Sequence, residues 1–240
     1  MSPRRCQRIK RVCDVGFSIV VLVVALPLLA AVALVALVVQ GRPVFYVSRR
    51  YVSPSRAIPI YKLRSMVPDA ESARYDLKGR YLRGGFLDVP LDSDAYTPFG
   101  RLLERTQIVE LPQVVNVLRD GLSWVGNRAL PYDNIMLLTQ FPGWEERFHS
   151  PCGLTGIAQV AGKHELSPEQ RITLERLYSR VYREGNVLRC DWHIALATLR
   201  LLLVDRSLGY QGAARLLERC LTTGKAAAPP RHAAPQGEDP

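Results

Sequence analysis

Two basic side chains, Lys62 and Arg64, are the first residues in this 240-residue sequence whose type and spacing could do chemistry. They alternate with apolar neighbours in the run IYKLRSM, and this period of two is typical of a β-strand that presents both side chains on one face. Cations placed in this way can hold the phosphate of a nucleotide or of a lipid head group, although a solvated basic face has the same pattern. Lys62 and Arg64 are therefore candidate phosphate ligands.

The cysteines and histidines form no recognisable metal-binding pattern. The five cysteines are scattered, none belongs to a C-x-x-C pair, and no spacing with the four histidines completes a zinc site. An odd and unpaired set of cysteines indicates a reduced, cytosolic compartment for the body of the protein. The sequence thus argues against a structural zinc ion or an iron–sulfur centre.

The net charge of +10 is confined to one end of the chain. Eleven basic residues and a single acid, Asp14, lie at or before Arg64, whereas the remaining 176 residues carry 21 bases and 21 acids. A nucleic-acid-binding domain usually has an overall basic bias, so no nucleic acid is expected as a partner. The basic end indicates anionic inner-membrane lipids instead.

Residues 15–41 carry no charge and are almost wholly aliphatic, which predicts a membrane helix. The apolar region of a signal peptide has only about 7–15 residues, so a retained segment is favoured over a cleaved one. The flanks of the run are both basic, whereas a helix that crosses the bilayer normally has its excess of Lys and Arg on one side. A simple spanning helix therefore fits the charges poorly.

Pro27 divides this run into two halves of 12 residues, 15–26 and 28–39. Each half is about 18 Å long as a helix, against a hydrocarbon core of about 30 Å. Because proline bends or breaks a helix, we expect a helix–break–helix that enters and leaves the same leaflet, with Pro27 at the membrane break. A single kinked span is the alternative.

The rest of the chain predicts short helices around a small β element. A β-hairpin is expected around Ser53-Pro54, and a capping box of Ser167 and Gln170 predicts the start of a helix. Apolar spacings of three and four predict two helical pieces across residues 98–118 and a helix at about 188–204. The expected segments are a basic lead (1–13), a re-entrant membrane segment (14–41), a cytosolic domain (42–222) and a disordered tail (223–240). The fold class is α/β and membrane-associated, with a re-entrant hairpin followed by a compact, mostly helical cytosolic domain.

A set of ordered motifs makes the sequence resemble the bacterial sugar transferase family, the monotopic polyprenyl-phosphate phosphoglycosyl transferases. Each motif alone is weak, but they occur in the family's order over about residues 10–208. The motifs are K-R-x-x-D from Lys10, the central Pro27, G-x-P-V-F-Y from Gly41, I-Y-K-x-R-S-M from Ile60, F-G-R-x-L from Phe99, E-L-P-Q-x-x-N-V-L from Glu110, S-x-V-G-x-R from Ser123 and G-L-T-G-x-A-Q-V-x-G from Gly153.

The resemblance implies a transferase on the cytoplasmic face of the bacterial inner membrane. Members of the family transfer a sugar-1-phosphate from a UDP-sugar to polyprenyl (undecaprenyl) phosphate with Mg²⁺ present, releasing UMP and initiating exopolysaccharide or surface-glycan synthesis. In the family an Asp-Glu pair supplies the nucleophile and helps to hold the metal, while basic side chains bind the phosphates. The resemblance thus makes UDP-sugar, polyprenyl phosphate and other glycan-assembly proteins the expected partners.

The family motifs also single out four further candidate site residues. Glu110 matches the metal-holding glutamate and is the candidate catalytic and Mg²⁺ residue. Arg105 lies close to that position as a second catalytic candidate. Arg128 stands in the remnant of a G-P-R-P turn and is a candidate phosphate ligand, and Asp191 matches a family acid near the substrate. A surface glutamate and ordinary salt bridges are the structural alternatives.

Position 109 departs from the family pattern. The family has L-D-E-L-P-Q, whereas this chain has Val109 directly before Glu110. Valine has no lone pair to attack phosphorus and no oxygen for Mg²⁺, so the family's covalent route cannot pass through this position. Glu104 also stands where the family has an arginine, and Asn127 and Ala129 replace the two prolines of the G-P-R-P turn.

Three functions remain open at this point. The first is a working transferase that uses Glu110 or a neighbour such as Asp120 or Asp133, or that transfers directly to the lipid phosphate. The second is a pseudoenzyme that binds polyprenyl phosphate or nucleotide and supports an active glycan-assembly complex. The third is an unrelated membrane-anchored adaptor, which the ordered motifs disfavour.

Overall fold

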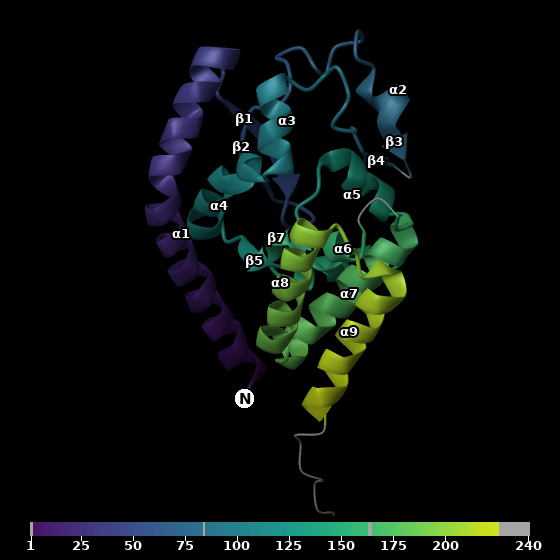
Figure 1. Cartoon of the computed structure of the whole chain (residues 1–240). Helices are drawn as coiled ribbons and strands as arrows, with labels where there is room; N and C mark the ends of the chain where they lie inside the picture. Colours follow the sequence, from purple (N-terminus) through teal and green to yellow (C-terminus); the bar gives the residue numbers. More distant parts are fainter. Residues whose placement is uncertain (1, 84, 163–164, 226–240) are drawn as a thin grey trace, which may run out of the picture.

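The computed structural model describes residues 2–83, 85–162 and 165–225 and is mostly helical with small sheets (Figure 1). Its α-helices are α1 (Pro3–Gln40), α2 (Leu77–Tyr81), α3 (Pro98–Arg105), α4 (Val114–Arg119), α5 (Tyr132–Leu138), α6 (Ile157–Val160), α7 (Pro168–Glu184), α8 (Val187–Val204) and α9 (Gly209–Lys225). Two 3₁₀-helices are η1 (Ile108–Gln113) and η2 (Trp144–His149). The strands are β1 (Phe45–Tyr51), β2 (Ala57–Leu63), β3 (Leu82–Arg83), β4 (Phe86–Leu87), β5 (Ser123–Val125), β6 (Asn127–Arg128) and β7 (Cys152–Thr155).

The apolar N-terminal segment forms one continuous helix, α1, with Pro27 inside it. The predicted helix–break–helix is therefore not confirmed, because the backbone does not turn back at Pro27. With 38 residues, α1 is about 57 Å long and follows the flank of the body in a curve (Figure 1). It is long and apolar enough to cross a membrane, by length and composition alone.

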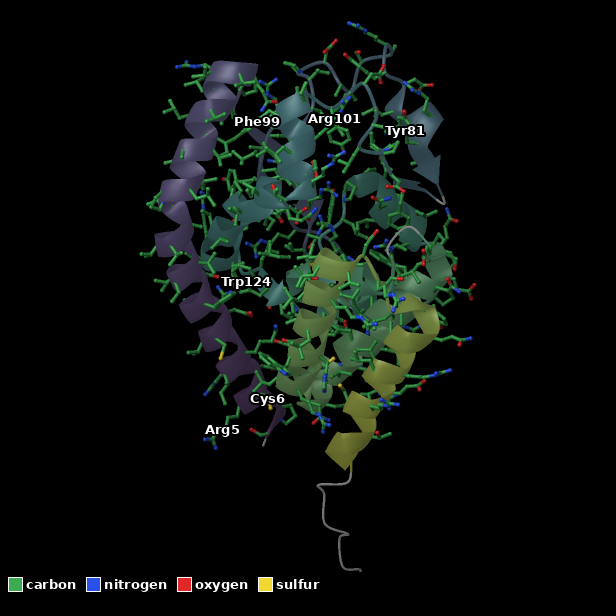
Figure 2. The ribbon with its side chains drawn as sticks, in the orientation of Figure 1. Arg5, Cys6, Tyr81, Phe99, Arg101 and Trp124 are labelled. Atoms are coloured by element: carbon green, nitrogen blue, oxygen red, sulfur yellow. The ribbon has the colours of Figure 1, made fainter. Side chains whose placement is uncertain are left out.

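One face of α1 packs on the body and the other is open and apolar. A buried stripe of Cys6, Lys10, Asp14 and Ser18 recurs every four residues and faces inward, as the helical period requires. Trp124, labelled in Figure 2, stacks edge-on against Phe17 with ring centroids 4.7 Å apart. The exposed side chains of the other face include Val20, Val23, Val24, Leu26, Leu34, Val38 and Val39.

The predicted β-hairpin is confirmed by β1 and β2, which pair antiparallel from Phe45 opposite Leu63 to Tyr51 opposite Ala57. Asn116 of α4 holds the hairpin to the body, because its Nδ2 donates to the Pro59 carbonyl at 2.7 Å. The hairpin thus carries its inward face against α4 and η1.

The two helical pieces predicted across residues 98–118 are present as α3 and α4, with η1 between them. The side chain of Thr97 accepts a hydrogen bond from the Gly100 backbone at 2.8 Å and so caps α3. A Cβ atom on Gly100 would lie 1.8 Å from the Ser65 carbonyl, so only glycine allows α3 to approach the hairpin this closely. α3 and η1 are thereby held beside β2.

The C-terminal helices form the largest core. The predicted capping box of Ser167 and Gln170 is confirmed at the start of α7, which packs with α8 and α9. A short parallel sheet in the order β5-β7-β6 lies beside them and was not predicted. α9 continues to Lys225, beyond the domain end expected at residue 222, and the remainder of the predicted tail, 226–240, lies outside the described residues.

Candidate active site

Glu110 lies at the centre of a group of charged side chains from three separate elements. Its Oε1 accepts a hydrogen bond from Lys62 Nζ of β2 at 3.0 Å and from Arg128 Nη2 of β6 at 2.8 Å. Arg128 also donates from Nη1 to the Leu154 carbonyl of β7 at 3.1 Å, which fixes its guanidinium. The short parallel sheet and the hairpin therefore bring Lys62 and Arg128 to the same carboxylate.

The electrostatics of this group keep Glu110 ionised. Burial alone would raise the pKa of Glu110, but the attraction of Arg128 and then of Lys62 outweighs it and holds that pKa well below its usual range. The pKa of Arg128 is raised, chiefly by the Glu110 carboxylate. A carboxylate stabilised in this way is a weak base and a weak nucleophile.

Arg50 of β1 adds a third cation that the sequence analysis missed. Together with Lys62 and Arg128 it lines a small cavity of ≈ 20 Å³. Burial, followed by repulsion from Arg128, lowers the pKa of Arg50. The hairpin register contains the signal for this residue: Tyr46 pairs with Lys62, so Arg50, four residues along β1, lies on the same face as Lys62.

Gln113, at the end of η1, is a second residue that the sequence analysis missed. Its side chain lines the same cavity and the residue is 4% exposed. Within the described parts of the chain, its Nε2 has no hydrogen-bond partner. A buried and unpaired donor costs free energy unless something else accepts its hydrogen bond.

We call Arg50, Lys62, Glu110, Gln113 and Arg128 the cation site. Arg64 does not belong to it, although the sequence placed Arg64 and Lys62 on one face. The buried Arg64 guanidinium donates to the backbone carbonyls of Pro43, Gln40 and Gly41, at 2.6, 2.6 and 2.9 Å. These bonds fix the end of α1 and its connection to β1, and the phosphate role predicted for Arg64 stays a prediction.

Asp191 is likewise placed away from the cation site. It forms an ion pair with Lys10 of α1, and its Oδ1 accepts a hydrogen bond from the Tyr178 hydroxyl at 2.8 Å. Asp14 of α1 joins the same group, since it accepts a hydrogen bond from Ser123 Oγ at 2.7 Å. We call Lys10, Asp14, Tyr178 and Asp191 the helix anchor. Asp191 thus holds α1 to the body, and its predicted role as a substrate ligand stays a prediction.

Arg105 is exposed, and no hydrogen bond or ion pair joins it to the residues that the structure describes. The structure does not bring it to Glu110, so its predicted catalytic role has no geometric support. Glu104 accepts a hydrogen bond from Ser65 Oγ at 2.7 Å, which ties this acid to the end of the hairpin.

Val109 points away from the cation site into an apolar cluster. It is 1% exposed and packs with the buried Leu63 and Leu103, against which Leu29 and Val32 of α1 also lie. Position 109 is therefore part of the contact between the body and α1. The cation site lies directly beside that contact, because Glu110 is the next residue along η1.

The other two carboxylates considered from sequence are also engaged elsewhere. Asp120 accepts a hydrogen bond from Asn116 Nδ2 at 2.7 Å, and Asp133 pairs with Lys78 at 2.7 Å on an exposed surface. Glu110 is thus the one predicted carboxylate that the described residues place between Lys62 and Arg128.

The donor set around Glu110 does not fit a protein-held magnesium ion. Mg²⁺ prefers carboxylate oxygens together with substrate phosphates. Glu110 supplies one carboxylate that is already paired with two cations, and Val109 supplies no oxygen. Within the described ranges, no group of three or more His, Cys, Asp or Glu side chains could hold a metal. The Mg²⁺ role predicted for Glu110 stays a prediction.

Sequence comparisons show that the chain is similar to bacterial sugar transferases. A sequence model of the family described as "Bacterial sugar transferase" matches residues 5–205. The putative undecaprenyl-phosphate N-acetylgalactosaminyl 1-phosphate transferase of Bacillus subtilis (strain 168) is 31% identical over 143 residues, which cover 59% of this chain and 74% of that protein. The uncharacterized sugar transferase EpsL of the same strain is 32% identical over 171 residues, 71% of this chain and 77% of that protein.

A more distant similarity extends over more of the chain. The undecaprenyl-phosphate galactose phosphotransferase of Salmonella typhimurium is 26% identical over 204 residues, which cover 83% of this chain. The match covers 42% of that longer protein.

Proposed function

Because the chain belongs to the bacterial sugar transferase family, we propose that it transfers a sugar-1-phosphate from a UDP-sugar to undecaprenyl phosphate and so initiates exopolysaccharide synthesis. The names of two relatives describe transfer to undecaprenyl phosphate, which supports this reaction. The observation that carries the proposal is the cation site, where Arg50, Lys62 and Arg128 surround a single carboxylate beside the membrane helix. Phosphoryl transfer depends on such cations for charge stabilisation.

We further propose that transfer is direct. A phosphate oxygen of the lipid attacks the sugar-bearing phosphorus, the bond from that phosphorus to the bridging oxygen breaks, and UMP leaves with that oxygen. Arg128 and Lys62 stabilise the charge on the diphosphate oxygens, while Glu110 orients both cations. Val109 offers no nucleophile, and the depressed pKa of Glu110 makes it a poor one.

The finer topology is also a proposal: the body lies on the cytoplasmic face of the inner membrane, and α1, a continuous curved helix, is embedded in the cytoplasmic leaflet with both of its ends on that face. Both ends of α1 contact the same body, which supports this arrangement. Lys10 pairs with Asp191 near one end, and Gln40 Oε1 accepts a hydrogen bond from the Thr97 hydroxyl at the other. The basic side chains at both ends then meet anionic lipid.

Cysteine labelling tests this topology on intact bacterial inner membranes. Cys13 is naturally exposed near the start of α1, and Arg42→Cys places a thiol just past its end. Each thiol is introduced alone into a background without other cysteines. We expect both to react only with reagent applied to the cytoplasmic side. Labelling from opposite sides would contradict the proposal and favour a spanning α1.

Release of UMP tests the reaction itself. The purified full chain in neutral detergent is given a panel of UDP-sugars with and without undecaprenyl phosphate, beside Glu110→Gln and Val109→Asp. We expect the natural protein to release UMP only when both substrates are present, and Glu110→Gln to be slower. Without acceptor, direct transfer predicts no stoichiometric burst of UMP.

Two outcomes would contradict the proposal. A burst of UMP without acceptor would indicate a covalent intermediate on the protein and exclude direct transfer. Activity of Val109→Asp alone would show that the natural chain is not a transferase and would support the pseudoenzyme that binds lipid or nucleotide.

A further inference from the structure

We propose that the cation site binds the diphosphate of the sugar donor without a magnesium ion, through Arg50, Lys62, Arg128 and Gln113. This inference rests on the proposed function for the identity of the donor. It goes beyond that function because it states what neutralises the diphosphate. Two side chains that the sequence analysis missed, Arg50 and Gln113, take part in it.

The charges of the cation site favour an anion. Arg50, Lys62 and Arg128 supply three positive charges. The Glu110 carboxylate pairs with Lys62 and Arg128, and Glu104 also attracts Arg128 but contributes least, so the positive charges outnumber the negative ones. The half-buried Arg50 has a lowered pKa, first because of its burial and then because Arg128 repels it. An anion with two or more charges would neutralise the excess and relieve this repulsion, and arginine can bind phosphate through two parallel hydrogen bonds.

The same charges disfavour a divalent cation. A magnesium ion would be repelled by the three neighbouring side chains and attracted by one carboxylate that is already paired with two of them. Position 109 contributes a buried valine to an apolar cluster. The positive charge that a metal ion would supply to the diphosphate is thus supplied by the side chains themselves.

The Gln113 side chain independently indicates that the cavity lacks a hydrogen-bond acceptor. Its Nε2 is buried, has no hydrogen-bond partner among the described residues and lines the same cavity as the three cations. A phosphate oxygen at this place would accept its hydrogen bond and remove the cost of an unpaired donor.

The shape of the site indicates where the diphosphate lies. The cavity, ≈ 20 Å³, is large enough for about one water molecule, so one phosphate oxygen fits inside and the remainder lies at the mouth. The side chains of Lys62 and Arg128 are 19% and 26% exposed, so solvent reaches both of them. They can bind the diphosphate while they remain close to Glu110.

Equilibrium binding tests the inference separately from turnover. Inorganic pyrophosphate and UDP are titrated calorimetrically into the full chain in neutral detergent, once with EDTA and once with excess MgCl₂. We expect saturable binding with EDTA and no tightening with MgCl₂. The inference would be overturned if binding required MgCl₂. It would also be overturned if neither pyrophosphate nor UDP bound.

Arg50→Gln and Arg49→Gln form a matched pair for this titration. Arg49 is the neighbouring residue on β1, is exposed and lies on the opposite face of the hairpin. With EDTA, Arg50→Gln should weaken pyrophosphate binding about tenfold or more, and Arg49→Gln should leave it unchanged. Equal binding by both variants would place the diphosphate elsewhere. Thermal unfolding of both variants checks that each is folded.

Gln113→Glu provides a second test that does not depend on removing a cation. The new carboxylate would give the site a second acidic group beside Glu110, so binding with EDTA should weaken and MgCl₂ should partly restore it. Unchanged binding with EDTA would show that Gln113 does not face the diphosphate. Metal-independent binding together with no UMP release would preserve this inference while contradicting the proposed function.

Discussion

Two groups of charged side chains, the cation site around Glu110 and the helix anchor around Asp191, differ in how their charges are balanced. In the helix anchor the cation of Lys10 faces the two carboxylates of Asp14 and Asp191. Lys10 also donates a hydrogen bond to a backbone carbonyl, and the Tyr178 hydroxyl donates one to Asp191. In the cation site three cations surround the carboxylate of Glu110. The polar groups of the anchor are paired within the described residues, whereas in our proposal an anion completes the cation site.

This difference in charge balance indicates a structural role for the helix anchor and a binding role for the cation site. Both groups come from motifs that the resemblance singled out, and both contain buried charges. The surplus charge is negative in the helix anchor, where one cation faces two carboxylates, and positive in the cation site, which also contains the unpaired Gln113 donor. A site for a charged substrate is expected to leave part of its charge and hydrogen-bonding capacity unpaired.

The largest expected effect comes from breaking the helix anchor. Lys10→Met leaves the buried carboxylates of Asp14 and Asp191 without their cation, and removal of one partner of a buried ion pair costs about 3–5 kcal/mol. Chemical unfolding in detergent should show this loss. Arg8→Met, at an exposed position of the same helix, should change stability little. Equal stability of the two variants would show that the anchor does not hold α1.

The second effect is on activity and separates two candidates from the sequence. Arg128→Gln removes a cation that contacts Glu110, and kcat/KM for UMP release should fall about 100-fold, the effect typical of losing one charge-stabilising donor. Arg105→Gln is the matched control, since Arg105 is exposed and contacts none of the cation site. If Arg105→Gln lowered kcat/KM as much as Arg128→Gln, the assignment of the catalytic arginine to Arg128 alone would be contradicted.

A smaller effect is expected at the contact between the body and α1. Val109→Ala removes two buried carbon groups from the apolar cluster, which should lower the free energy of unfolding by about 2 kcal/mol. Val115→Ala on α4 is an exposed control and should cost much less. A negligible cost at Val109 would mean that this side chain is not packed against α1.

The last expected effect is a pH dependence within the helix anchor. Burial raises the pKa of Asp191 to about 6, although Lys10 and then Tyr178 act in the opposite direction. The folded chain therefore binds this proton more tightly than the unfolded chain, for which the ordinary value is 3.8. Stability from this group is present below about pH 4 and is lost as the pH rises to about 6.

Thermal unfolding of the natural chain and of Asp191→Asn between pH 4 and 8 measures this dependence. The natural chain should lose stability relative to Asp191→Asn as the pH rises from 4 to 6, and the difference should be constant above that range. A difference that increases in favour of the natural chain over the same range would mean that the ion pair, and not burial, controls Asp191.

The features that the sequence predicted correctly depend on interactions within a few residues. The hairpin around Ser53-Pro54 and the capping box of Ser167 and Gln170 are of this kind, and both are present. The parallel sheet was missed because its strands have two to four residues each, too few for a period of two to be recognised. Its pairing also joins β5 and β6 to β7, which lies far along the chain.

The contacts of two candidate site residues could not be predicted for a related reason. Arg64 and Asp191 have side chains suited to substrate binding, but their partners, the carbonyls at the end of α1 and the Lys10 ammonium, come from distant parts of the sequence. Residue type alone cannot choose between such partners. Arg50 could have been found, because the hairpin register follows from the position of the turn and places it on the face of Lys62.

The claim that surplus cations bind the donor is tested most directly by kcat/KM for UMP release from Arg50→Gln beside Arg49→Gln, with undecaprenyl phosphate and the preferred UDP-sugar. Arg50 lines the cavity and Arg49 lies on the opposite face of the same strand, so the two variants differ only in which face of β1 loses its charge. The account predicts a loss of about tenfold or more for Arg50→Gln and none for Arg49→Gln. Equal activity of the two variants would contradict it.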